Sequence, residues 1–358
     1  MAKLNEQQLL LLNNLMYYAG SAGKDKTRVE DIVEDILKAS PDELKASGTL
    51  SGGFDKNPEN MYEIAKAIAE DEALCRLEVV RSVNKNNVRA SCFYDSSTDE
   101  AVVAVRGTGG SYDAWHDNFE GVYDNDTTCQ ETLLEFVNDL DYQNITITGH
   151  SKGGNFAVYA SAFCDKEIQD RIQKVYSNDG PGFRDEILKT EGYQNILPRV
   201  ISILPEESIV GVLLSNEYEH HIVKSSAKAI NQHDPMTWQV LGPTFEEAKH
   251  RSEGSILFDK TMMTWLATMS DEDRAIFTDI LFSSAESTGV TTLNEISEGG
   301  VKIISEIRKA IKDMPSERQQ ELSEMVKRLL RINSELLRAD VKETAKLPKL
   351  PKMNLHHS

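Results

Sequence analysis

The sequence lacks a long hydrophobic segment. Its 358 residues contain no run of about 18 or more apolar side chains, the length that a membrane-spanning helix needs. The opening Met1-Ala2-Lys3-Leu4-Asn5 also lacks the basic and apolar regions of a secretory signal peptide. We therefore expect a cytoplasmic protein, long enough for one large core with an appendage or for two domains.

Cysteine is scarce and scattered. Cys75, Cys92, Cys129 and Cys164 form no CxxC pair and have no spacing typical of a zinc site. We expect buried or free thiols rather than disulfides or metal ligands.

Positive charge is in short supply. The chain has 39 Lys and Arg residues against 58 Asp and Glu residues, for a net charge of −19. Such a charge repels phosphate backbones, which argues against nucleic acid as a partner. Four lysines gather near the C-terminus, but they lie among prolines and small residues, and we interpret them as a solvated tail: Lys342, Lys346, Lys349 and Lys352. Membrane docking by this tail is the minor alternative.

Hydrophobic periodicity separates a helical start from an α/β core. Residues 1–75 carry helical patterns, interrupted by a glycine-rich loop at 47–53. Strand-like runs at 77–83, 88–94 and 101–105 follow, with an asparagine-rich turn between the first two, and predict antiparallel strands. Further strands at 145–148, 174–177 and 200–204 then alternate with helices at 128–140 and 152–163. Residues 76–243 are thus predicted to form a mostly parallel central sheet with helices on both faces.

The last part of the chain is predicted to be helical again, over 244–340, followed by a flexible tail at 341–358. Ser270 and Asp273 have capping-box spacing, and Leu322, Val326, Leu329 and Leu336 recur at helical intervals. We expect these helices to pack on the sheet domain. The alternative is a partner-binding appendage through which the chain forms a homo-oligomer.

A candidate nucleophile lies in Gly149-His150-Ser151-Lys152-Gly153. This G-x-S-x-G string follows the apolar strand at 145–148 and precedes a helix, which is the context of a nucleophile elbow. Glycines on either side let the strand turn sharply, and Ser151 then stands at a helix N-terminus that favours developing negative charge. A tight strand-to-helix turn without chemistry is the structural alternative.

An oxyanion hole needs two donors. The backbone N–H of Lys152, directly after the serine, would supply one. For the second, the strand at 101–105 enters Arg106-Gly107-Thr108-Gly109-Gly110, which would bring the Thr108 N–H and hydroxyl to the same end of the sheet. Thr108 could equally cap a turn.

Three segments together resemble the class 3 lipase family, and most closely its uncharacterised bacterial relatives with lysine after the serine. They are Arg106-Gly107-Thr108, then Asp113-Ala114-Trp115-His116-Asp117-Asn118, then Thr148-Gly149-His150-Ser151-Lys152-Gly153-Gly154-Asn155. The similarity spans about residues 77–241. It implies an α/β-hydrolase fold and a Ser-His-acid triad that acts on acyl esters without a metal or organic cofactor. The helical N- and C-terminal parts are not explained by the lipases proper.

The general base is expected last in the order serine, acid, histidine. His233 lies in a polar turn after the strand-like 222–225, much as the histidine of class 3 lipases follows a strand, and is favoured over His220, His221 and His250. A loop histidine that caps local backbone is the alternative.

The acid has two candidates of equal rank, Asp179 and Glu207. Lipases carry it after the strand that corresponds to 200–204, in an Asp-x-Val setting, but Ser208-Ile209-Val210 occupies that place here. Glu207, or its neighbour Glu206, would serve from beside that position, whereas Asp179 would serve from one strand earlier. Either could instead be a solvated loop carboxylate.

These residues predict a serine hydrolase that cleaves a small-molecule or lipid ester through an acyl-enzyme. Two alternatives share the scaffold: an interaction protein that has lost turnover and works through its C-terminal helices, and an acyltransferase or thioesterase. An acid within hydrogen-bond reach of His233 favours the enzyme, and a long exposed apolar helix face favours the interaction protein.

Overall fold

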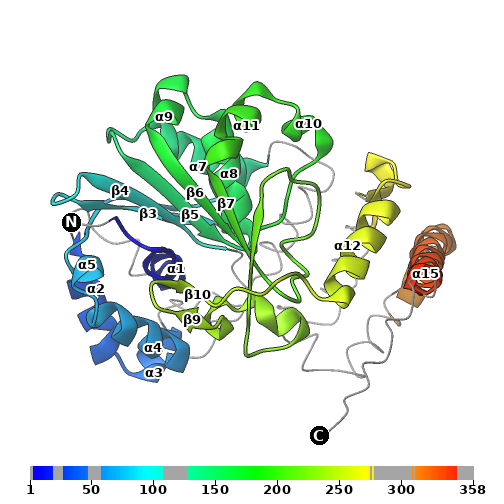
Figure 1. The fold of residues 1–358 in the computed structure, drawn as a ribbon, viewed down its shortest axis with the longest axis horizontal. Coiled ribbons are helices and arrows are strands. Elements are labelled where there is room, and N and C mark those ends of the chain that lie inside the picture. The colour runs from blue at the N-terminus through cyan, green and yellow to red at the C-terminus, as the bar shows by residue number, and fades with distance from the viewer. Residues whose placement is uncertain are drawn as a thin grey trace, which may run out of the picture.

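An eight-stranded sheet forms the centre of the molecule (Figure 1). The computed structural model describes residues 3–18, 27–46, 58–107, 127–274, 276–277, 309 and 311–344. The strands follow chain order across the sheet, and their bounds are β1 Thr27–Arg28, β2 Glu78–Lys85, β3 Val88–Asp95, β4 Glu100–Val105, β5 Ile145–His150, β6 Ile172–Asn178, β7 Val200–Pro205 and β8 His220–Val223. Neighbours from β1 to β4 are antiparallel, and those from β4 to β8 are parallel. The predicted mostly parallel sheet with an antiparallel start is confirmed, and the chain has the α/β-hydrolase fold.

Helices cover both faces of the sheet because its central strands are apolar on both sides. Along β4, Ala101, Val103 and Val105 belong to one buried cluster, while Val102 and Ala104 belong to another. The first cluster lies under α7 (Thr128–Asn138) and α8 (Lys152–Phe163), and the second lies under α1 (Glu6–Leu15), α2 (Val29–Lys38) and α4 (Pro58–Ala69). The N-terminal helices thus share a core with the sheet (Figure 1). Five short helices complete this part: α3 Pro41–Ala46, α5 Glu72–Cys75, α9 Lys166–Arg171, α10 Asp185–Leu188 and α11 Glu191–Ile196.

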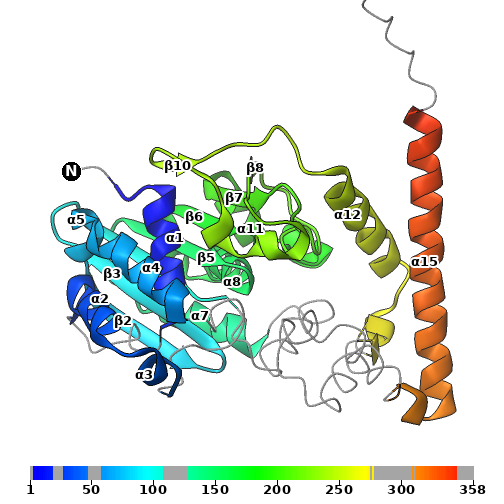
Figure 2. The same cartoon turned by 90° about the horizontal axis from the view of Figure 1, so that it is seen from below.

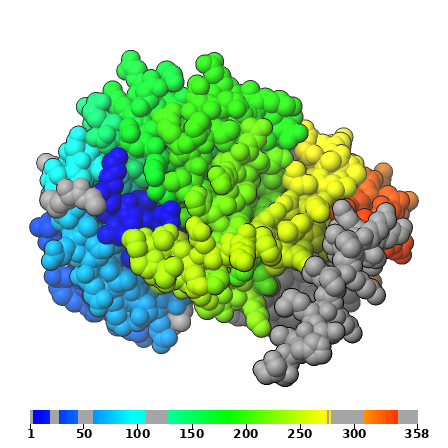
Figure 3. Space-filling view, viewed as in Figure 1, coloured from blue at the N-terminus to red at the C-terminus, as the bar shows by residue number. Residues whose placement is uncertain are grey.

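A small hairpin near residue 243 contacts the first helix of the chain. Strands β9 (Val240–Leu241) and β10 (Thr244–Phe245) pair with each other, and the predicted boundary after residue 243 falls between them. Gln7 of α1 donates hydrogen bonds of 2.6 Å to the carbonyls of Gly242 and Thr244. Figure 3 shows the yellow-green hairpin against blue α1 on the surface. The hairpin therefore helps to hold α1 on the sheet.

Two of the described helices, α12 (Glu253–Leu266) and α15 (Ser316–Thr344), lie at one side of the sheet domain (Figure 2), to which α12 is joined by a hydrogen bond of 2.7 Å from Ser255 Oγ to Ser208 O. Helix α15 packs along α12, and the two bury a third apolar cluster built around Trp265, Met325 and Ile332. The predicted capping box is confirmed, since Ser270 N–H contacts the Asp273 carboxylate and Asp273 N–H contacts Ser270 Oγ. Within the described part of the chain, no helix has both the length and the apolar character to cross a membrane.

We expect Trp265→Ala to release α15 without unfolding the sheet domain. The Trp265 ring is buried between the two helices, and its indole N–H donates to Met325 O at 3.0 Å. Truncating such a ring costs about 3–5 kcal/mol. Hydrogen exchange should accelerate throughout α15 while the amides of β4 to β7 keep their protection. Equal loss of protection in the sheet would show that α15 and the sheet domain fold as one unit.

Candidate active site

Ser151 occupies a sharp turn between β5 and α8. Its backbone has φ 57° and ψ −132°, an uncommon conformation for a residue with a side chain, and its N–H is held by Asn178 O at 2.9 Å. A Cβ on Gly149 would lie 2.0 Å from Gly153 O, and one on Gly153 would lie 2.5 Å from Val105 O. Both flanking glycines are therefore required by close backbone packing, as a nucleophile elbow demands.

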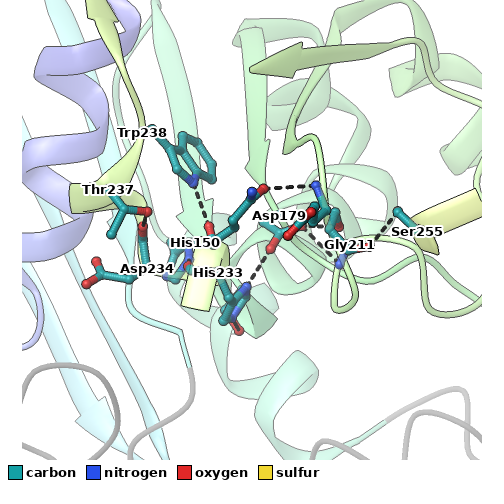
Figure 4. Close-up of polar contacts among 12 residues, drawn as sticks. His150, Asp179, Gly211, His233, Asp234, Thr237, Trp238 and Ser255 are labelled. Carbon is teal, nitrogen blue, oxygen red and sulfur yellow. Dashed lines mark hydrogen bonds and ion pairs between the residues drawn. The ribbon is translucent and has the colours of Figure 1, made fainter. Parts of the chain in front are cut away.

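His233 lies between Ser151 and the carboxylate of Asp179, and Figure 4 shows its contact with Asp179. Its Nε2 lies 2.9 Å from Ser151 Oγ, and its Nδ1 lies 2.6 Å from Asp179 Oδ2. Because the carboxylate is an acceptor, Nδ1 carries the proton and Nε2 is left to accept the serine hydroxyl. All three side chains are buried, with exposed fractions of 5% for Ser151, 4% for His233 and 0% for Asp179. The structure thus brings together three of the predicted site residues in the chain order serine, aspartate, histidine.

Asp179 is held by donors on its other oxygen. It follows β6 directly and has a φ of 47°. Its Oδ1 accepts hydrogen bonds from Ser208 Oγ at 2.5 Å and from Gly211 N at 3.1 Å. A Cβ on Gly211 would come within 2.4 Å of that same oxygen, so only glycine fits there. Ser208, which stands where the resemblance predicts the acid, instead donates to the acid.

Glu207 lies apart from the histidine and is not the acid that contacts it. Its carboxylate accepts a hydrogen bond from the backbone N–H of Ala229, at the start of the 3₁₀ helix Ala229–His233. Its own N–H donates to Gln232 Oε1 at 2.9 Å. Glu207 therefore supports the loop that carries His233. The sequence could not separate it from Asp179, because the choice depends on how the loops after β6 and β7 fold.

The three other candidate histidines and Glu206 also lie outside the Ser151–His233–Asp179 contacts. His220 is hydrogen-bonded to Ser202 Oγ at 2.8 Å, and burial lowers its pKa to about 4. His221 is exposed, and His250 contacts Arg251 O. The backbone N–H of Glu206 donates to Val223 O, on the neighbouring strand β8.

His150 is a site residue that the sequence analysis passed over. Its Nε2 lies 2.8 Å from the backbone carbonyl of His233, and the two rings are 4.7 Å apart at 34°. Its Nδ1 lies 3.4 Å from the hydroxyl of Tyr17. Burial, and to a lesser degree the charge of His233, lowers the pKa of His150 to about 3, so the ring is neutral at ordinary pH. Its place inside the serine motif was the one available signal. Nothing local in the sequence pointed to Tyr17.

Of the two predicted oxyanion donors, Lys152 lies in the described part of the chain and Thr108 does not. Lys152 is the first residue of α8, so its backbone N–H lies at the positive end of that helix. Its buried side chain runs along the helix, with Nζ 5.0 Å from the centre of the Phe156 ring. Thr108 lies outside the described residues. The preceding Gly107 lies against the nucleophile, since a Cβ there would be 2.9 Å from Ser151 Cβ.

The site has no arrangement of metal ligands within the described part of the chain, where no group of three or more His, Cys, Asp or Glu side chains could hold an ion. The contacts instead suit nucleophilic chemistry. A serine hydroxyl is hydrogen-bonded to an imidazole, and that imidazole is oriented by a buried carboxylate.

The Mbeg1-like family model matches residues 76–283. No curated protein sequence matches the chain. Among solved structures, the Rhizomucor miehei lipase propeptide complex is 13% identical with a TM-score of 0.30, over 51% of this chain and 64% of that chain. MDLA of Penicillium cyclopium is 13% identical with a TM-score of 0.36, over 69% and 87%. The M37 lipase is 16% identical with a TM-score of 0.35, over 59% and 70%. These likenesses are too distant to assign any residue.

We expect acid to destabilise the fold through His150. The unfolded chain binds a proton at this residue below about pH 6.5, whereas the folded chain binds one only near pH 3. The free energy of unfolding should therefore fall by roughly 1.4 kcal/mol per pH unit between these values from this group alone. Urea unfolding at pH 7, 6 and 5 should show a shallower fall for His150→Gln than for the wild type. The exposed His221→Gln should keep the wild-type slope, and equal slopes for all three proteins would contradict the assignment.

Proposed function

Since the chain belongs to the Mbeg1-like family, a lipase-like family, we propose that it is a serine hydrolase that cleaves carboxylic esters of small molecules or lipids. The observation that carries this proposal is the position of the His233 ring, whose two nitrogens lie 2.9 Å from Ser151 Oγ and 2.6 Å from Asp179 Oδ2. No other described histidine contacts both a hydroxyl and a carboxylate.

In the first half-reaction, Ser151 Oγ attacks the ester carbonyl carbon while His233 Nε2 takes the hydroxyl proton. The carbonyl oxygen becomes an oxyanion, which the backbone N–H groups of Lys152 and Thr108 stabilise in our proposal. Asp179 stabilises the imidazolium that forms and keeps its ring in place. His233 then donates its proton to the leaving alkoxide, the C–O bond breaks, and an alcohol departs from the acyl-enzyme.

In the second half-reaction, water takes the place of the alcohol. His233 accepts a proton from this water as the water oxygen attacks the acyl carbon. The tetrahedral intermediate collapses with return of the proton to Ser151 Oγ, which releases the carboxylic acid. The same three side chains serve both steps.

The role of the acid separates this proposal from a scaffold that only resembles a hydrolase. We expect Ser151→Ala to abolish labelling by a fluorophosphonate probe and hydrolysis of short-chain p-nitrophenyl esters. Asp179→Asn should lower kcat by roughly 10³- to 10⁴-fold, because an amide would favour the wrong tautomer of His233. The matched change Glu207→Gln should leave kcat within about twofold of the wild type, since an amide oxygen still accepts from Ala229.

Folded wild-type protein that neither reacts with the probe nor turns over any ester would overturn the proposal. If Glu207→Gln were the inactive variant and Asp179→Asn the active one, the hydrolase would stand but its acid would be misassigned.

A second function, self-association, is favoured by one face of α15. Ser323, Val326, Leu330 and Leu337 lie on one side of this helix, and the three apolar side chains are 39%, 63% and 44% exposed. None of the four is charged. With a net charge of −19, the chain repels its own copies over most of its surface, whereas an uncharged stripe meets itself without that repulsion. We propose that two copies pair through this stripe.

The self-association proposal predicts a concentration-dependent dimer in light scattering coupled to size exclusion. Replacing both Leu330 and Leu337 with Glu should shift the wild-type dimer to monomer, because two carboxylates would be buried without partners. Gln320→Glu adds one negative charge to an exposed position of α15 outside these four residues and should leave the dimer intact. A wild-type chain that stays monomeric at all concentrations would exclude this role and leave the hydrolase proposal untouched.

A further inference from the structure

Two side chains connect the N-terminal helix to the backbone of the proposed base. Tyr17 follows α1, is buried, and has its hydroxyl 3.4 Å from His150 Nδ1. His150 Nε2 lies in turn 2.8 Å from the carbonyl oxygen of His233. We infer that Tyr17 and His150 are positioning residues for the hydrolase, and that this hydrogen-bond chain fixes the place of His233 relative to Ser151. The inference rests on the proposed function.

The two hydrogen bonds, from Tyr17 to His150 and from His150 to His233, require one tautomer of the His150 ring. The carbonyl oxygen of His233 is an acceptor, so His150 Nε2 must carry a proton. His150 is neutral because burial lowers its pKa, and Nδ1 is then an acceptor for the Tyr17 hydroxyl. Without the Tyr17 donor, Nδ1 loses this hydrogen bond and the ring can rotate. Nε2 would then move away from the His233 carbonyl, and that carbonyl would lose a fixed donor.

Tyr17 itself is anchored by contacts that surround it. Arg89 Nη1 donates to the carbonyls of Met16 at 3.3 Å and Tyr17 at 3.1 Å, which satisfies the end of α1. One turn earlier in the helix, Asn13 Nδ2 donates to Thr148 Oγ1 at 2.9 Å, two residues before His150. Helix α1 is therefore hydrogen-bonded to β5, the strand directly before Ser151, and the Tyr17 hydroxyl lies beside the end of that strand.

Close packing at Gly107 shows how little room the hydroxyl has. A Cβ on this glycine would lie 2.5 Å from Tyr17 Oη, 2.7 Å from His150 O and 2.9 Å from Ser151 Cβ. The Tyr17 hydroxyl thus shares one small volume with the nucleophile and with the segment that leads to Thr108. The family model begins at residue 76, so α1 supplies this contact from outside the matched region.

The test compares the loss of one hydroxyl at two neighbouring tyrosines. Tyr17→Phe should lower kcat roughly three- to tenfold, the effect of one ordinary hydrogen bond, with KM unchanged within about twofold. Tyr18→Phe is the matched control, because it removes a hydroxyl from the neighbouring residue. Burial, and then the charge of Asp35 in α2, raises the pKa of Tyr18, so this hydroxyl is influenced by α2. The kcat and KM of Tyr18→Phe should equal those of the wild type. Thermal unfolding of both variants checks that the fold is intact.

His150 provides the second comparison. His150→Phe removes the donor to the His233 carbonyl and should lower kcat at least tenfold. Loss of a group that orients a metal-binding histidine lowers activity by a similar factor of roughly 10 to 100. His150→Gln keeps an amide N–H near the place of Nε2 and should retain most of the activity. A merely structural role would instead lower stability in both variants without separating their kcat values.

A spectroscopic readout does not depend on turnover. The ¹⁵N shift of His150 Nδ1 should be that of a hydrogen-bonded acceptor in the wild type and in Tyr18→Phe, and should move toward that of an acceptor without a hydrogen bond in Tyr17→Phe. Unchanged shifts and unchanged kcat in Tyr17→Phe would overturn the positioning role while the hydrolase proposal stands. An inert wild type with the expected shifts would instead overturn the hydrolase and leave the Tyr17–His150 bond in place without a catalytic role.

Discussion

The arrangement of the site depends on the burial of one carboxylate. Asp179 has no exposed surface, and a charged group in that position is stable only if donors fill its oxygens. His233 fills Oδ2, and Ser208 with Gly211 fills Oδ1. These partners come from the loops after β7 and β8, whereas Asp179 itself follows β6. One carboxylate therefore ties three consecutive strand ends together and, through His233, sets the distance to Ser151.

The parallel sheet explains why the acid can stand after β6 rather than β7. Parallel strands end at the same edge, so residues that follow neighbouring strands lie side by side. Here Asn178 pairs with Ile203, and the N–H of Asp179 donates to Ile203 O at 2.8 Å. A carboxylate after either strand thus reaches the same small volume. Ser208, in the place where class 3 lipases carry the acid, is near enough to donate to it, so the position keeps a polar role.

Local pattern was sufficient for β2 to β7, for α8 and for the serine turn, because each of these follows from a short run of residues. The two-residue strands β1, β9 and β10 were not predicted. The run at 145–148 buries Ile145 and Ile147 in one apolar cluster, and the glycines around Ser151 are needed by close backbone contacts. The choice between Asp179 and Glu207 was not local. Both are loop carboxylates in sequence, and only the path of the chain after β7 turns Glu207 toward Ala229 and Ser208 toward Asp179. Tyr17 was beyond prediction for the same reason, since 133 residues separate it from His150.

Backbone strain at two strand ends connects the fold to the chemistry. Ser151 and Asp179 both have positive φ values, 57° and 47°, which side chains rarely adopt and which cost roughly 1–3 kcal/mol each. Each strained residue is held by a backbone hydrogen bond from the next strand, Ser151 N–H by Asn178 O and Asp179 N–H by Ile203 O. The strain persists because the sheet register, fixed by apolar packing on both faces, leaves these residues no relaxed alternative. Burial in the two clusters beside the sheet therefore keeps a serine hydroxyl and a carboxylate aimed at one imidazole.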